Sequence, residues 1–173
     1  MSYECFLLIR TTLHAKRVLA GAVLSQQGVY WAKAIYGPYQ IVAYIRDDDE
    51  TALIDRIEKL RAERPIAEMD VRRCKPLPED SALPPFMGDH TQPVRACLLI
   101  NVDPHITKER IVVGNLRKIA GVRMARAMWG PTDVIAIVEA ADHEGMRNLI
   151  CDEVKIMEGI TSNTTLFCYP EAQ

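Results

Sequence analysis

An eleven-residue stretch occurs twice in the sequence, as GVYWAKAIYGP over Gly28–Pro38 and as GVRMARAMWGP over Gly121–Pro131. The opening Gly-Val, both alanines and the closing Gly-Pro coincide, and three further positions exchange similar residues, such as Tyr36 for Trp129. A match of this length without an internal gap is the signature of a repeat. The chain is therefore predicted to be a tandem duplication, with this stretch at the same place in each unit.

The repeated stretch has the pattern of a β-hairpin. Residues of Val29–Tyr36 alternate between two faces with a period of two and are rich in aromatic and β-branched types, which favours a strand. Gly37–Gln40 is a turn signal, and Ile41–Ile45 forms the returning strand. The second copy repeats this order over Val122–Val138. Each unit is thus predicted to have a hairpin at its centre.

Further elements flank the hairpin in the same order in both copies. The apolar run Cys5–Ile9 predicts a buried strand, and apolar residues at helical spacing across Val18–Val23 and across Leu53–Leu60 predict two helices. A more polar strand, Met69–Lys75, completes the first copy, and residues 96–169 repeat the pattern. The order β-α-β-β-α-β is that of a ferredoxin-like unit.

The predicted fold class is α+β, with two tandem ferredoxin-like units over residues 1–76 and 94–173 and a proline-rich linker over residues 77–93. Both helices of such a unit cover one face of its sheet. The hairpin strands are apolar on both faces, so a single copy would expose a hydrophobic sheet. We therefore expect the units to pack sheet to sheet as a pseudo-dimer of the dimeric α/β-barrel type.

Composition excludes several classes of function. The chain has 21 basic and 23 acidic residues and a net charge of −2, so it lacks the basic excess that direct nucleic-acid binding needs. No apolar run approaches the ~18 residues of a membrane span, and the N-terminus does not resemble a secretory signal. We expect a cytoplasmic protein with no membrane partner. The five cysteines lack metal-binding spacing, so buried packing is expected for them, Cys151 included.

The sequence shows no catalytic motif. Its four histidines, His14, His90, His105 and His143, are scattered, and none recurs between the copies or has a companion at metal-ligand spacing. We therefore expect no catalytic residue, no metal, no cofactor and no enzymatic activity. Lys33 and Arg126 share a mid-strand position in the repeat, and the pattern leaves open whether they are surface cations or line a cavity.

The second copy resembles a known family. Its first strand is followed by Val102-Asp103-Pro104, its hairpin is preceded by Ile-Ala-Gly-Val, and its turn reads Trp-Gly-Pro-Thr-Asp-Val before a threonine-rich last strand. These elements are similar to the ligand-binding and dimerisation domain of the Lrp/AsnC family of amino-acid-responsive regulators. The resemblance covers residues 94–169, and the first copy, residues 3–76, is a divergent version.

The resemblance implies a ligand site near the hairpin turns. The family pattern there is a glycine, any residue, an aromatic and an aspartate; the first copy has Tyr39 and Gln40 at the last two places, and the second has Thr132 and Asp133. Alternate polar residues of the last strand would complete the site. The expected ligand-binding residues are Gly130, Thr132, Asp133, Asn163, Thr165, Tyr39 and Gln40.

The resemblance further implies a stand-alone sensing and oligomerisation module of regulatory type, without the helix-turn-helix of the family. Its partners would be a small molecule such as an amino acid, and further copies of itself or another Lrp/AsnC-type protein. Two alternatives stay open. One is a dimeric α/β-barrel enzyme, such as a haem-dependent or cofactor-free oxygenase, and the other is an assembly module without a ligand.

Overall fold

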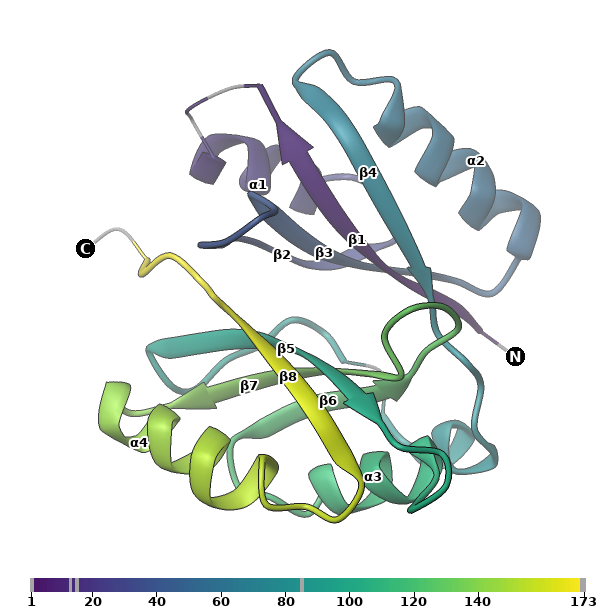
Figure 1. The fold of residues 1–173 in the computed structure, drawn as a ribbon. Coiled ribbons are helices and arrows are strands. Elements are labelled where there is room, and N and C mark those ends of the chain that lie inside the picture. The colour runs from purple at the N-terminus through teal and green to yellow at the C-terminus, as the bar shows by residue number, and fades with distance from the viewer. Residues whose placement is uncertain (1, 13, 15, 85, 172–173) are drawn as a thin grey trace. The chain divides into compact units, whose positions relative to one another are not determined.

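The computed structural model describes residues 2–12, 14, 16–84 and 86–171. The chain divides into two compact units, Met1–Cys74 and Lys75–Gln173. Each unit contains a four-stranded antiparallel sheet with two helical segments on one side of it (Figure 1). Among the described residues, no helix has both the length and the apolar character needed to cross a membrane.

The first unit has a sheet with strand order β2-β3-β1-β4. Every neighbouring pair in this sheet is antiparallel. In chain order its elements are β1 (Tyr3–Thr11), α1 (Lys16–Leu24), β2 (Val29–Ala34), β3 (Ile41–Asp47), α2 (Glu50–Arg61) and β4 (Ile66–Arg73).

The second unit repeats this arrangement, with strand order β6-β7-β5-β8. After a short 3-10 helix, η1 (Pro78–Ala82), its elements are β5 (Val94–Val102), α3 (Glu109–Leu116), β6 (Val122–Ala127), β7 (Val134–Ala140), α4 (His143–Asn148), a π-helical turn η2 (Leu149–Val154) and β8 (Ile160–Phe167). The element order and strand order confirm the predicted α+β class with two ferredoxin-like units.

The first glycine of the repeated stretch takes the same backbone conformation in both units. Gly28 has φ +85° and Gly121 has φ +92°, the left-handed region that side chains disfavour. Each glycine accepts a hydrogen bond from the far end of its own hairpin, Gly28 from Arg46 N–H at 2.9 Å and Gly121 from Glu139 N–H at 2.8 Å. The recurrence of this glycine therefore reflects how the hairpin begins.

One face of the second sheet forms a core with its helices. Val112, Val113 and Leu116 of α3 are buried in it, as are Met146, Leu149, Ile150 and Val154 of α4 and η2. The predicted second helix of this unit is α-helical only to Asn148, because Lys155 N–H bonds to Ile150 O in the i to i+5 pattern of a π turn. Cys151 lies on this turn and is exposed, so its predicted core position is wrong.

The proline-rich segment lies within the second unit. Phe86 is buried, and the His90 side chain is almost fully buried. The Leu77 N–H donates to the Asp80 side chain at 2.9 Å and starts the short helix η1. Residues that the sequence presents as a linker thus form part of the second unit's surface layer.

The two repeat glycines should differ in their tolerance of a side chain. A Cβ at Gly121 would lie 2.6 Å from Glu139 O and 2.8 Å from Leu149 Cδ1, whereas at Gly28 its nearest contact, at 2.7 Å, is the flexible end of Arg56. We expect Gly121→Ala to lower the free energy of unfolding by about 2–4 kcal/mol and Gly28→Ala by about 1–2 kcal/mol. Urea unfolding measures both.

Gly114 provides the control for this comparison. It lies within α3, and a Cβ there would meet nothing within 4 Å. Gly114→Ala should therefore stabilise the protein by about 0.5–1 kcal/mol through helix propensity alone. Equal losses at Gly28 and Gly121 would contradict the idea that the close approach of Glu139 O makes Gly121 the more demanding position.

Candidate functional site: an arginine-lined cavity in the second unit

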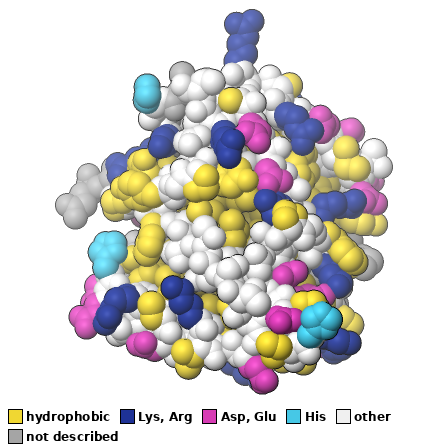
Figure 2. Space-filling view, in the orientation of Figure 1, with side chains coloured by type: hydrophobic (Ala, Val, Ile, Leu, Met, Phe, Trp, Pro, Cys, Tyr) yellow, Lys and Arg dark blue, Asp and Glu magenta, His cyan; other side chains and the backbone are white. Residues whose placement is uncertain are grey.

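Charged side chains of both signs are interspersed on the face of the molecule shown in Figure 2. Several arginines pair with acids of their own unit, among them Arg56 with Asp47 and Arg110 with Glu79. Because most such pairs lie near the surface, each contributes about 1 kcal/mol or less. In the second unit, three arginines also line one cavity.

The cavity has a volume of about 500 Å³ and lies beside β6, an edge strand of its sheet. Its walls come from the proline-rich segment, the end of α3 and residues 122–126 of β6. Most of the lining side chains are apolar, and three are arginines. The lining residues are Leu83, Pro84, Phe86, Met87, Asp89, Arg117, Val122, Arg123, Met124, Ala125 and Arg126.

Two of the arginines converge on one backbone oxygen. Arg117 donates to Ala125 O from Nε at 3.3 Å and from Nη2 at 2.9 Å, and Arg126 donates to the same oxygen from Nη1 at 3.3 Å. Arg117 also pairs with Asp80, and Arg126 is only 5% exposed. Two guanidinium groups therefore lie close together at the cavity, and a guanidinium group can donate hydrogen bonds to an anion.

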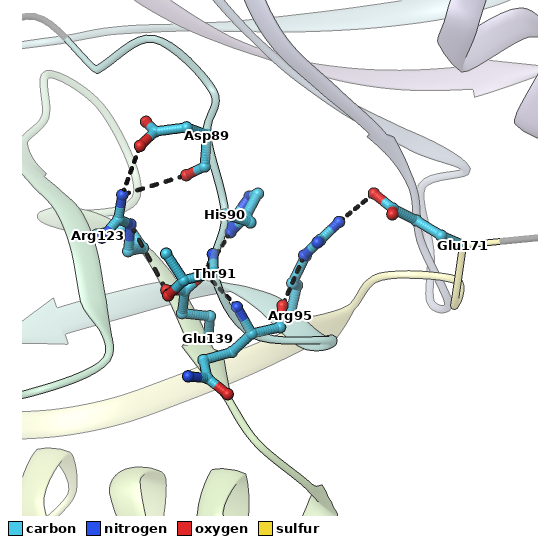
Figure 3. A network of polar contacts seen from close by, with 8 residues as sticks. Asp89, His90, Thr91, Arg95, Arg123, Glu139 and Glu171 are labelled. Carbon is cyan, nitrogen blue, oxygen red and sulfur yellow. Dashed lines mark hydrogen bonds and ion pairs between the residues drawn. The ribbon is translucent and has the colours of Figure 1, made fainter.

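Glu139, a buried acid of β7, holds the wall of the cavity in place (Figure 3). Its Oε2 lies 2.8 Å from His90 Nδ1 and accepts the Thr91 N–H at 3.1 Å and the Gln92 N–H at 3.4 Å. Its Oε1 accepts the Thr91 hydroxyl at 2.7 Å and lies 3.7 Å from Arg123 Nε. One carboxylate thus joins the proline-rich segment to the sheet beside the cavity.

The protonation of Glu139 follows from these contacts. Burial alone would raise the pKa of its carboxyl group, but hydrogen bonds from Thr91 and His90 outweigh burial and lower this pKa below its ordinary value. The side chain is therefore a carboxylate at neutral pH.

Two of the residues predicted at the hairpin turns have backbone partners. Asp133 Oδ2 accepts the Val102 N–H at 2.7 Å, and Gln40 Oε1 accepts the Thr11 N–H at 3.0 Å. Asp133 and Gln40 therefore have the same structural role in the two units. Each side-chain oxygen accepts a hydrogen bond from the backbone N–H at the end of the first strand of its unit, β5 or β1. Tyr39 donates from its hydroxyl to Asp70 Oδ2 at 3.2 Å.

The structure separates the predicted residues of the second unit into two groups. Gly130, Thr132 and Asp133 lie together in the β6–β7 turn, whereas Asn163 and Thr165 lie in β8. Since β5 runs between β7 and β8, the two groups are about 10 Å apart, two strand spacings. Tyr39 and Gln40 belong to the first unit.

Asn163 differs from its neighbours in its hydrogen bonding. Both polar atoms of its amide are buried and have no hydrogen-bond partner among the described residues. It is paired in register with Ile100, whose side chain lies in the core shared with the helices. A buried amide left in this way costs free energy until a ligand or water satisfies it.

Sequence reasoning misses most of the cavity. It identifies Arg126 as a cation that either lies at the surface or lines a cavity, but it does not select Arg117, Arg123 or Glu139. The available signal is the pair Phe86 and Met87, two large apolar residues inside a segment otherwise typical of a linker.

Comparisons with known proteins show the fold. No protein-family model and no curated protein matches the chain. The solved structure of the siroheme decarboxylase NirDL is 11% identical, covers 96% of this chain and 71% of its own, and has a TM-score of 0.68. NirDL in complex with an iron-uroporphyrin III analogue gives a TM-score of 0.65 at 10% identity.

Two further structures extend this comparison. A haem-binding protein from Thermus thermophilus is 10% identical, covers 98% of this chain and 92% of its own, and has a TM-score of 0.55. A transcriptional regulator from Neisseria meningitidis, in complex with L-Met, is 16% identical over 72% of this chain and 73% of its own, with a TM-score of 0.41. The resemblance to Lrp/AsnC proteins thus reaches only a coarse relation in fold.

The prediction that the chain is not an enzyme is contradicted by these matches. Structures that span nearly the whole chain include an enzyme, the siroheme decarboxylase. The prediction relies on the lack of a nucleophile, a paired acid or a metal cluster in the sequence. That reasoning is insufficient, because the residues that bind and orient a substrate can be distant in the sequence and leave no short motif, and a fold alone does not determine whether a protein is an enzyme.

Replacement of Glu139 tests the buried carboxylate. Glu139→Gln keeps the side-chain size but removes the charge, and we expect it to lower the free energy of unfolding at pH 7 by about 1–3 kcal/mol. Because the pKa of Glu139 is lowered in the folded state, its contribution is present above the ordinary pKa of ~4.3 and is lost as pH falls through the folded value. The difference between variant and wild type should therefore vanish in acid.

Urea unfolding over a pH series measures this difference. Glu144→Gln is the matched control, because Glu144 is an exposed acid on α4 of the same unit. A Glu139→Gln variant as stable as the wild type at pH 7 would contradict the proposed role of the carboxylate.

Proposed function

We propose that the second unit binds an anionic, largely apolar small molecule in the arginine-lined cavity, and that a carboxylated tetrapyrrole is the ligand class. The observation that carries the proposal is the convergence of Arg117 and Arg126 on Ala125 O, within walls that are mostly apolar. Arginine suits this task, because its planar fork matches a carboxylate in two-point contact.

The size and lining of the cavity are those of a small-molecule site. Small-molecule sites are mainly apolar clefts of about 300–1,000 Å³ with a few polar groups that fix orientation, and this cavity has about 500 Å³. Phe86, Met87 and Met124 offer flat or adaptable apolar surface to a ring system. The arginines would bind the carboxylates at its edge.

The names of the structures that match nearly the whole of this chain support the choice of ligand class. One is a siroheme decarboxylase that was also solved with an iron-uroporphyrin III analogue, and another is a haem-binding protein. These proteins share the fold of this chain, and about a tenth of their aligned residues are identical to it. Their names therefore select which ligand class to test, whereas the cavity supplies the physical reason.

The residues present fit the edge and ring of a tetrapyrrole. The arginines match its carboxylates, the apolar walls match its ring, and the thioethers of Met87 and Met124 are the soft ligands that line the cavity. The Nδ1 atom of His90 faces Glu139. When bound, an iron tetrapyrrole supplies one-electron redox chemistry, and this chain supplies its binding and orientation.

A second candidate function is amino-acid sensing, and the buried amide of Asn163 favours it. An amide offers both donor and acceptor groups, so it can bind the carboxylate and the ammonium of a zwitterion. Thr165 lies two positions along the same strand. In this proposal the module is regulatory, and ligand binding changes its assembly with further copies of the chain.

Titration with iron uroporphyrin tests the first proposal. We expect the wild type to shift the visible absorption of this probe, and Arg126→Gln to weaken binding about tenfold or more, the equivalent of about 1.4 kcal/mol. Arg147→Gln is the control, because Arg147 lies exposed on α4 away from the cavity lining. A wild type that causes no absorption change would contradict the proposal, as would equal binding by the Arg126→Gln variant whose fold is verified by circular dichroism.

A thermal-shift screen with amino acids tests the second proposal. Asn163→Leu removes the buried amide, and we expect it to stabilise the unliganded protein by about 1–3 kcal/mol, because the cost of the unsatisfied group disappears. An amino acid that raises the melting temperature of the wild type should have no effect on the variant. Thr164→Val, an exposed position of the same strand, is the control. A shift that persists in Asn163→Leu would contradict this site.

A further inference from the structure

Arg123 connects two carboxylates that differ greatly in exposure (Figure 3). Its Nη2 lies 2.9 Å from Asp89 Oδ2 and also donates to Asp89 O at 3.3 Å, and its Nε lies 3.7 Å from Glu139 Oε1. The side chain of Asp89 is 69% exposed, whereas that of Glu139 is 3% exposed. The guanidinium group thus has a buried partner on one side and a solvated partner on the other.

The two ion pairs differ in how readily they exchange. Ions and water screen the pair with Asp89, so it contributes little and breaks at small cost. The pair with Glu139 is buried, and hydrogen bonds from Thr91 fix the carboxylate in place. Arg123 is therefore held by Glu139, and its outer edge can exchange Asp89 for another carboxylate.

Asp89 and Arg123 both line the cavity. The backbone on either side of Asp89 is anchored, because Phe86 is buried against the His90 ring, with centroids 6.1 Å apart, and His90 contacts Glu139. Displacement of Asp89 consequently needs only a rotation of its exposed side chain. The wall of the cavity can stay in place while the anion on Arg123 changes.

We propose that Asp89 is a built-in competitor for the ligand's carboxylate, an inference that rests on the proposed function of this cavity. In the absence of ligand Asp89 occupies Arg123. A ligand that already engages Arg117 and Arg126 through one carboxylate gains Arg123 by displacing Asp89 with another. Asp89 therefore favours ligands with several carboxylates over those with one, since its displacement takes a carboxylate in addition to the one at Arg117 and Arg126.

Titration of iron uroporphyrin into four variants tests this competition. Asp89→Asn should tighten binding about fivefold, the equivalent of about 1 kcal/mol, because the competitor is removed. Arg123→Lys keeps a cation beside Glu139 but removes the Nη2 atom that contacts Asp89, and in this background Asp89→Asn should have no further effect. Glu79→Gln removes the same charge from a partner of Arg110 outside the cavity lining and should leave the affinity unchanged.

The outcomes separate the two levels of the proposal. A fivefold gain that disappears in the Arg123→Lys background supports competition at Arg123. Unchanged affinity of Asp89→Asn, a gain that persists in Arg123→Lys, or an equal gain in Glu79→Gln would overturn the competition while binding itself still stands. Failure of every variant to bind the probe would overturn both the competition and the proposed function.

Discussion

The buried carboxylate of Glu139 is the interaction on which the cavity depends. It accepts hydrogen bonds from the side chains of His90 and Thr91 and from the backbone N–H groups of residues 91 and 92. These bonds attach the proline-rich segment to β7. Without this anion the donors of the segment would lie against the sheet with no acceptor, which has the free-energy cost of unmade buried hydrogen bonds. The same carboxylate also orients Arg123. A single acid thus shapes the wall and positions a cation of the site.

The fold could be predicted from the sequence because its signals are local. Alternation, turn residues and the recurring glycine each report a backbone conformation within a few positions, and Gly28 and Gly121 have the same positive φ in the structure. Helix faces are predicted less well. Val18 is 75% exposed and Ile111 is 55% exposed, although helical spacing places both on apolar faces. The rotation of a short helix is set by what it packs against, which the sequence of the helix does not contain.

The candidate site could not be predicted in the same way, because its contacts join distant residues. His90 and Glu139 are 49 positions apart, and the proline-rich segment that contains His90 has no hydrophobic period. The turn residues are selected by a family pattern. In the structure, Asp133 and Gln40 make equivalent contacts, because each accepts a backbone N–H of its own unit. An amide oxygen and a carboxylate oxygen accept that bond equally well. The exchange of aspartate for glutamine in the first copy therefore has a structural explanation that does not involve a ligand.

The repeat also shows why the cavity belongs to the second unit. At the repeat positions of Arg117, Arg123 and Arg126 the first unit has Leu24, Tyr30 and Lys33, and at the position of Glu139 it has Arg46. The first copy thus lacks two of the three cations and replaces the buried acid by a base. Because a base cannot accept hydrogen bonds from an incoming segment, the first unit could not hold a wall in this way. The three arginines and the buried acid beside Arg123 occur together in one copy, which is the expected arrangement if they serve one site.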